Sequence, residues 1–217
     1  MPDTFDLKPE FLVTDEAALR SGFAPTHEIA VKKCIDHIDP HARAFIERAP
    51  FLCIGTQSAA GTADVSPRGD PRGFVRILDP HTLLIPDRPG NNRLDTLSNI
   101  LGNPAVGLLF LIPGYEDTLR VNGEALLTRD PDLLAPLSVN GRAPTLGIVV
   151  RVREVFLHCA KALRRSRLWD PEERQDRSAL PSLMTIIHDQ TNSAPATKAD
   201  MDALDRKLEE AYRTSMY

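Results

Sequence analysis

Residues 105–112 read AVGLLFLI, and this unbroken apolar run decides our interpretation of the fold. A run of this length suits a strand that is buried on both faces, and it is far too short to span a bilayer. The sequence Gly-Asn-Pro at 102–104 ends a predicted helix just before it. We therefore predict a central strand at residues 105–112.

Short apolar runs separated by turn signals extend on both sides of this strand, from Phe51 to Phe156. Predicted strands cover residues 51–57, 62–66, 74–78, 82–86, 118–128 and 146–156. One helix is predicted among them, at residues 91–102, and a hairpin turn at 58–61. About seven strands with one inserted helix favour a closed barrel over a parallel sheet, because strands and helices do not alternate.

The rest of the chain reads as helical. Predicted helices before the barrel cover residues 14–21, 28–37 and 40–48, the first of them capped by the run Thr-Asp-Glu. Predicted helices after it cover residues 158–169, 181–190 and 197–212, with a linker at 191–197 and a capping pattern from Thr197 to Asp200. We expect an N-terminal helical extension (1–49), a barrel domain (50–171) and a C-terminal helical extension (172–217).

The composition argues against several classes of function. The net charge is −4, so a general nucleic-acid-binding role is not expected. The first eight residues lack an apolar signal core and no apolar run could span a bilayer, so we expect no membrane partner. Three scattered cysteines indicate a reducing compartment, and we expect a cytoplasmic protein. Neither the cysteines nor the six histidines have metal-ligand spacing, so no metal site is expected.

Ser66 and Arg68 form the first candidate site, in the stretch SPRGD at 66–70 where the second predicted strand ends. Residues two apart in an extended chain point to the same side, so one ligand can meet a hydroxyl and a guanidinium there. Taken alone, the stretch is explained more simply by a surface turn with a solvated arginine.

The second candidate is the stretch PDRPGNNR at 86–93, which joins a strand to the start of a helix. Such a junction presents free backbone N–H groups and the positive end of the helix dipole. Arg88 and Arg93 add guanidinium groups suited to phosphate, and Asn91 or Asn92 can cap the helix and donate to an oxyanion. The alternative is a well-capped helix with solvated arginines, but the crowding of these four side chains favours an anion site.

The third candidate is the stretch HCAKALRRS at 158–166, which we predict to be helical. On a helix, His158, Lys161 and Arg165 share one basic face at spacings of three and four. This face leaves the end of the barrel directly and can reach a second phosphate or a ligand held by a neighbouring subunit. A solvated basic face explains the pattern equally well.

These three stretches, in this order, resemble the pyridoxamine 5′-phosphate oxidase-like superfamily, also called FMN-binding split barrels. The resemblance covers roughly residues 50–171 and extends to an uncharacterised bacterial subfamily of FMN-dependent proteins. Those proteins carry the stretches Ser-Pro-(Arg/Lys)-Gly-Asp, Pro-Asp-Arg-x-Gly-Asn-x-Arg and His-Cys-x-Lys-Ala, and all three stand in this sequence. The resemblance implies a mainly β (α+β) fold built on an antiparallel split β-barrel, which forms a homodimer with FMN at the interface.

The resemblance also implies a set of cofactor-binding residues. The phosphate of FMN would be held by Asn91, Asn92 and Arg93, with Arg88 nearby. The isoalloxazine ring would be lined by Val65, Ser66, Pro67 and Arg68, with a polar side chain from Thr118 or Arg120. His158 and Lys161 would contact substrate or phosphate.

The expected function is that of an FMN-dependent oxidoreductase acting on a small molecule of unknown identity. The Ser-Arg-Lys triplet of the oxidase proper is replaced here by Asn-Asn-Arg at 91–93, and its C-terminal Trp and Arg-x-His motif is not evident. Pyridoxamine phosphate is therefore not expected to be the substrate. Two alternatives stay open, which are a non-catalytic flavin-binding sensor or carrier and a split barrel that uses a deazaflavin or haem.

Overall fold

The computed structural model describes residues 6–191 and 197–217, in two units. The first unit ends at Cys34 and contains a short 3₁₀ turn, η1 (Pro9–Phe11), and two short helices, α1 (Glu16–Ser21) and α2 (Glu28–Lys32). Asp15 rather than Thr14 caps α1, by accepting a hydrogen bond from the Ala18 N–H. None of the described residues of this unit is buried, so these helices lack the packed face that stabilises most short helices.

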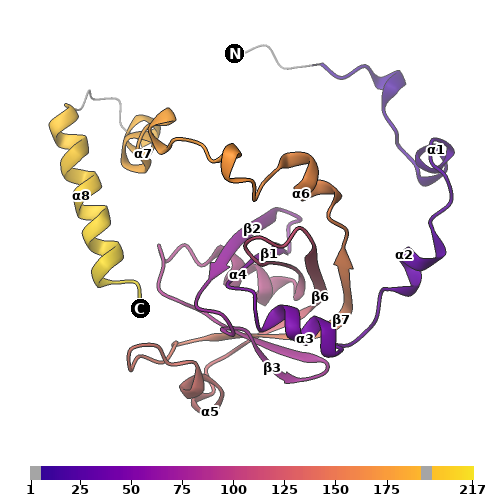
Figure 1. The fold of residues 1–217 in the computed structure, drawn as a ribbon, viewed down its shortest axis with the longest axis horizontal. Helices are drawn as coiled ribbons and strands as arrows, with labels where there is room; N and C mark the ends of the chain where they lie inside the picture. The colour runs from indigo at the N-terminus through magenta and orange to yellow at the C-terminus, as the bar shows by residue number, and fades with distance from the viewer. Residues whose placement is uncertain (1–5, 192–196) are drawn as a thin grey trace. The chain divides into compact units, whose positions relative to one another are not determined.

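The second unit, Ile35–Tyr217, is built on one seven-stranded antiparallel sheet with the strand order β2-β1-β5-β6-β7-β4-β3. The strands are β1 (Phe51–Gln57), β2 (Ala63–Gly69), β3 (Arg76–Asp79), β4 (Thr82–Pro86), β5 (Ala105–Leu111), β6 (Thr118–Thr128) and β7 (Gly147–His158). Helices flank the sheet (Figure 1). The predicted class, mainly β with peripheral helices and antiparallel pairing, is confirmed.

The sheet is not closed, and in this respect the structure departs from a closed barrel. The edge strands β2 and β3 are not paired with each other in the described chain. The long strands β6 and β7 pair along their whole length and connect the two ends of the sheet. Their register shifts between Asn122 and Gly123, and a Cβ at Gly123 would lie only 2.2 Å from the Arg151 oxygen. The close backbone approach at this bulge therefore requires glycine and bends the long pair.

The core lies on one face of this sheet, beneath α3 (Pro40–Ile46) and α4 (Asp95–Gly102). β5 lies between β1 and β6, as expected of an interior strand, but it is not buried on both faces. Val106, Leu108 and Phe110 point into the core, whereas Leu109 and Leu111 lie half-buried on the opposite face. The apolar run at 105–112 therefore reflects one core face and one partly covered outer face.

A second, smaller apolar cluster lies behind β4. It joins Leu84 to α5 (Pro131–Leu134) and the 3₁₀ turn η2 (Ala135–Leu137) through Leu134 and Leu137. This cluster positions the loop that carries residues 138–146 toward β7.

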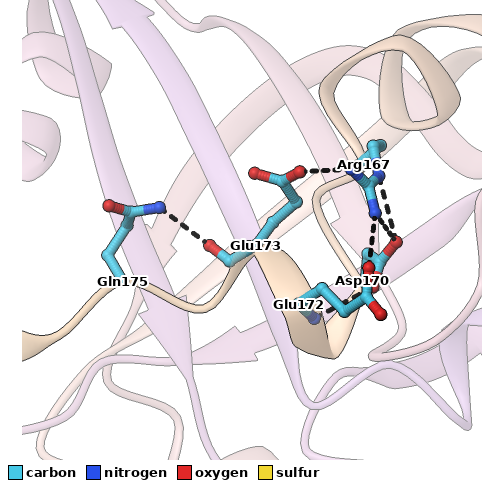
Figure 2. Close-up of polar contacts among 5 residues, drawn as sticks. All are labelled: Arg167, Asp170, Glu172, Glu173 and Gln175. Carbon is cyan, nitrogen blue, oxygen red and sulfur yellow. Dashed lines mark hydrogen bonds and ion pairs between the residues drawn. The ribbon is translucent and has the colours of Figure 1, made fainter.

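After β7 the chain continues through α6 (Lys161–Ser166) and the turns η3 (Pro171–Glu173) and η4 (Arg177–Ala179). Arg167 ends α6 in a left-handed conformation, and its guanidinium pairs with Asp170, Glu172 and Glu173 (Figure 2). The Glu172 backbone N–H and then Arg167 lower the pKa of Asp170 below its ordinary value. These acidic groups are thus used to form a surface turn.

The segment after β7 is fastened to the loop between β5 and β6. The Trp169 indole N–H donates to the main-chain oxygen of Tyr115 at 2.7 Å, and Arg164 pairs with Glu116 at 2.6 Å. The helix predicted at residues 158–169 is shorter in the structure, where only Lys161–Ser166 is helical.

Two helices complete the described chain, α7 (Leu183–Thr191) and α8 (Lys198–Thr214). The predicted capping box at Thr197 and Asp200 is confirmed. Most of the predicted linker at 191–197 lies outside the described residues. In the part of the chain that the structure describes, we find no helix with the length and apolar character needed to cross a membrane.

Candidate functional site

A cavity of about 1310 Å³ opens between the end of β2, the loop from β4 to α4, the first turn of α4 and the loop before β7. It brings together two of the three candidate stretches. The predicted residues that line it are Ser66, Pro67, Arg68, Arg88, Asn91, Asn92 and Arg93. The two stretches are separated by 15 residues, which include β3 and most of β4, and the fold places them at one site.

β2 sends alternate side chains to opposite sides of the sheet, and the cavity is lined by Ser66 and Arg68 from one side and by Pro67 from the other. Ser66 is paired with Ile54 and Arg68 with Leu52, both of which are buried core residues. Cross-strand partners share a face, so Ser66 and Arg68 point toward the inner side of the sheet. Val65 points the other way, is 69% exposed and does not line the cavity.

A cluster of hydroxyl groups around Asp64 joins β2 to α4. The Ser66 hydroxyl donates to Asp64 Oδ2 at 3.2 Å, and Thr96 Oγ1 lies 3.1 Å from both Asp64 Oδ2 and Ser66 Oγ. Asn99 of α4 donates to the Thr56 hydroxyl at 3.0 Å. These contacts fix the first turns of α4 against the inner face of β1 and β2.

α4 begins later and differently than the sequence predicts. Its N-cap is Leu94, which has a left-handed φ of 61° and makes no side-chain capping bond. The expectation that Asn91 or Asn92 caps the helix is therefore wrong. Asn91 instead accepts a hydrogen bond from the Arg93 N–H, and Asn92 adopts a left-handed φ of 58°. The first N–H groups of α4 lack a side-chain cap, so this helix start is open to an anion.

The three predicted arginines of the cavity have different roles. Arg88 is largely buried and donates through Nε to Asp70 at 2.6 Å and through Nη2 to the Leu137 oxygen at 2.9 Å. Arg93 is 74% exposed and pairs with Asp95 at 2.7 Å. Arg68 has a buried Nε without a hydrogen-bond partner among the described residues. Arg88 thus holds the loop in place, whereas Arg68 carries an unused donor.

Positively charged side chains outnumber negatively charged ones around the cavity. It is lined by five arginines, which are Arg68, Arg88, Arg93, Arg129 and Arg142, and by three aspartates, which are Asp64, Asp87 and Asp95. Burial raises the pKa of Asp87, and the positive charge of Arg68 partly opposes this effect. With Asp70 and Asp95 already paired, positive charge remains available at the Arg68 side of the cavity.

The other predicted site residues lie away from this cavity. Thr118 of β6 is paired with His158, the last residue of β7, and Lys161 begins α6. His158 therefore belongs to a strand, and the single helical face predicted for His158, Lys161 and Arg165 does not form. Only Cys159 and Ala160 separate the end of β7 from α6, and Ala160 already has helical backbone angles.

Arg120 lies on the outer face of the sheet. Its guanidinium is 4.2 Å from the centre of the Phe156 ring and pairs with Glu154 at 3.2 Å. Its Nε is buried and has no hydrogen-bond partner within residues 6–191 and 197–217. This face is distinct from the cavity, which lies on the inner side.

Several residues of the site were not found from the sequence. Asp64 has the same alternation as Ser66 and Arg68, so strand periodicity could have revealed it. Asp70 belongs to the stretch SPRGD, but nothing in the sequence indicates its ion pair with Arg88. Tyr217 lines the cavity with no sequence signal, because it is 147 residues from its partner Asp70. In the described ranges, no group of three or more potential metal-ligating side chains forms a cluster.

Comparison with known proteins gives a family and several distant structural matches. HupZ from Group A Streptococcus is 16% identical, with a TM-score of 0.47 over 55% of this chain and 93% of its own. General Stress Protein 26 from Bacillus anthracis is 14% identical, with a TM-score of 0.42 over 53% of this chain and 88% of its own. An FMN-binding protein from Syntrophomonas wolfei is 9% identical, with a TM-score of 0.41 over 54% and 88%.

No curated protein sequence matches this chain. The family model described as pyridoxamine 5′-phosphate oxidase matches residues 38–159, a range that contains all seven strands of the sheet and most of the cavity. Since this match covers more than half of the sequence, the chain belongs to the pyridoxamine 5′-phosphate oxidase family.

Proposed function

We propose that this protein is an FMN-dependent oxidoreductase that acts on a small molecule other than pyridoxamine phosphate. The observation that carries the proposal is that one cavity contains both the buried Arg68 Nε and the start of α4, and that among the described residues the first has no hydrogen-bond partner and the second has no side-chain cap. Family membership supports the same cofactor class. The cytoplasm is the proposed location, in keeping with three free cysteines.

The cavity fits FMN in size and in the chemistry of its walls. Its volume of about 1310 Å³ exceeds that of typical small-molecule sites, so a flat tricyclic ring with a phosphorylated tail can enter. Pro67, Phe74 and Leu97 supply apolar surface for a ring. The open helix start and the arginines supply donors for a phosphate.

We assign the phosphate end to the loop before α4. The α4 N–H groups, the amide of Asn92 and the Arg93 guanidinium would together hold the phosphate. Arg93 is exposed and its pairing with Asp95 is a surface contact, so its side chain can turn toward a stronger anion at small cost. Arg88 would act from behind, since its bond to Asp70 fixes the loop.

We assign the ring end to β2. Bound FMN supplies hydride or electron transfer. Arg68 places its positive charge on the inner side of β2 and would stabilise the negative charge of a reduced ring. The Ser66 hydroxyl, held by Asp64 and Thr96, would give one fixed polar contact. Asp87, whose pKa is raised by burial, can hold a proton on its carboxyl at a higher pH than an exposed aspartate.

The homodimer is also a proposal, and it is supported by the outer face of the sheet. This face carries partly exposed apolar side chains, among them Phe51 and Val65, and the Arg120 Nε lacks a partner in the described chain. Gly55 and Gly107 are paired on it, so a second copy can approach the backbone closely. In such a dimer, Thr118, Arg120, His158 and Lys161 would contribute to the cofactor site of the partner subunit.

The test is the identity of the small molecule that the purified protein carries. We expect a yellow protein that releases FMN on denaturation, identified by mass spectrometry, and whose colour is bleached by a reduced nicotinamide cofactor. Release of haem or a deazaflavin would show that FMN is not the cofactor and that the released molecule is. A yellow protein that no reductant bleaches would favour the sensor or carrier. Purification without any chromophore, together with failure to take up added FMN, would refute the proposal.

A further inference from the structure

Tyr217 lies in the wall of the cavity, although it follows α8 and is remote in sequence from the other lining residues. Its hydroxyl donates to Asp70 Oδ1 at 2.7 Å, and the Arg88 guanidinium lies 5.5 Å from the centre of its ring. Its main-chain oxygen accepts a hydrogen bond from Arg142 Nη1 at 2.5 Å. One residue therefore joins the end of β2, the loop before α4 and the loop before β7.

Asp70 is the centre of this network. Its side chain is only 1% exposed, with one carboxylate oxygen bound to the Arg88 Nε and the other to the Tyr217 hydroxyl. A buried carboxylate depends on such bonds, because each one replaces a lost contact with water. The hydrogen bond to Asp70 raises the pKa of the Tyr217 phenol, which keeps its proton and remains a donor at neutral pH. Tyr217 thus fixes Arg88 indirectly.

The position of Tyr217 matters for the shape of a ligand. In the proposed function, the phosphate of the flavin lies near the loop that carries Arg88 and Arg93. A mononucleotide ends at this phosphate, whereas a dinucleotide continues from it into a second phosphate, a ribose and an adenine. Those additional groups must leave the cavity beside the phosphate. Tyr217 lines the cavity together with Arg88 and Arg142 and is in contact with both, so its ring stands in the cavity wall next to the loop that carries Arg88.

We propose that Tyr217 is a specificity-determining residue that restricts the cavity to a flavin mononucleotide and excludes the dinucleotide FAD. This inference rests on the proposed function, because it takes a flavin phosphate to lie near Arg88. The restriction has two parts. The phenol ring occupies the exit that the adenosine half requires, and its hydroxyl keeps Arg88 bound to Asp70 and away from a second phosphate.

The experiment compares FMN and FAD binding to the flavin-free full-length chain by fluorescence titration. The variants are Tyr217→Ala and Tyr217→Phe, with Tyr212→Ala as the matched control on α8. We expect Tyr217→Ala to shift the ratio of the two dissociation constants toward FAD by about tenfold or more. Tyr217→Phe keeps the ring and should retain most of the preference, and Tyr212→Ala should retain all of it.

An unchanged FMN-to-FAD ratio in a folded Tyr217→Ala protein would overturn the inference, even if the parent protein binds FMN tightly. If the parent protein binds neither flavin, the proposed function fails on its own. The hydrogen bonds by which Tyr217 anchors the end of α8 to Asp70 and Arg142 are then tested in the flavin-free chain. Trypsin can cleave within α8, where Arg206 and Lys207 are exposed, and the rate of cleavage reports how firmly α8 is held. We expect cleavage to be faster in Tyr217→Ala than in Tyr212→Ala, and equal rates would refute the anchoring.

Discussion

Two helices of this chain begin in opposite ways. α8 starts with a complete capping box, in which Thr197 and Asp200 each bond to the backbone N–H of the other. α4 starts at Leu94, in a left-handed conformation and without a side-chain cap. A capped start satisfies its own N–H groups, whereas an open start leaves them for a ligand. The N-terminus of α8 is therefore stabilised by its own cap, whereas the N-terminus of α4 keeps unsatisfied N–H groups beside the cavity.

Because α4 has no side-chain cap, the loop before it must be held in place by another contact. The Asp70–Arg88 ion pair provides that contact. Arg88 connects the loop before α4 to the end of β2 and to the Leu137 oxygen behind β4. Both partners are shielded from water, with side chains that are 16% and 1% exposed. The loop is therefore held by a buried contact at its beginning instead of by a cap at its end.

The largest expected effect comes from breaking this ion pair. Arg88→Met removes the cation and leaves the buried Asp70 carboxylate without it, which should lower the free energy of unfolding by about 3–5 kcal/mol. Urea denaturation followed by circular dichroism measures the change. Arg93→Met is the matched control, because the Arg93–Asp95 pair is exposed and its loss should change stability little. Equal losses in the two variants would contradict the assignment of Arg88 to structure and Arg93 to ligand.

The next effect concerns the open helix start itself. Arg93→Ala should weaken FMN binding by about tenfold or more, because a hydrogen bond between two charged groups is lost. Titration of the flavin-free protein with FMN measures the dissociation constant. Arg153→Ala is the control, since Arg153 forms a comparably exposed pair with Glu124 on β6 but does not line the cavity. If Arg93→Ala binds FMN as tightly as the parent, the phosphate does not lie at this loop.

The sequence predicts the sheet well because alternation and turn residues act locally. The bounds of β1, β4 and β6 match the predicted ranges, and β5 is one residue shorter. The prediction of a closed barrel is wrong. Whether the edge strands β2 and β3 can pair depends on how β6 and β7 bend at Gly123, which is a tertiary feature. α4 begins four residues later than predicted, since the left-handed conformations of Asn92 and Leu94 have no clear signal in the sequence.

The candidate site is only partly predictable, for a physical reason. Ser66, Arg68 and Arg93 were found because they lie in motifs with local geometry. The burial of Arg88 depends on Asp70, 18 residues away, and on a loop beyond β6. Tyr217 depends on the docking of α8, which no local pattern encodes. Residue types reveal which groups can bind an anion, but tertiary contacts decide which of them remain free to do so.

The smallest expected effect is a pH dependence from Asp87, which lines the same cavity as the open start of α4. Burial raises its pKa above the ordinary value of 3.8, and Arg68 only partly offsets this. The folded state therefore holds the proton more tightly than the unfolded state. Stability should fall as the pH rises from the ordinary value toward the raised one, and the full penalty should persist above it.

Asp87→Asn removes this penalty and should raise the melting temperature at neutral pH, with little difference from the parent below the ordinary pKa of an aspartate. Thermal denaturation at a series of pH values measures both limits. Asp205→Asn, in α8, is the control, because Asp205 does not line the cavity. The opposite result is that the parent protein becomes more stable than Asp87→Asn as the pH rises through the same range. That result would mean that the charge of Arg68 outweighs the effect of burial on the Asp87 carboxyl. Arg68 would then be committed to Asp87, and the donor we assign to the flavin ring would not be free.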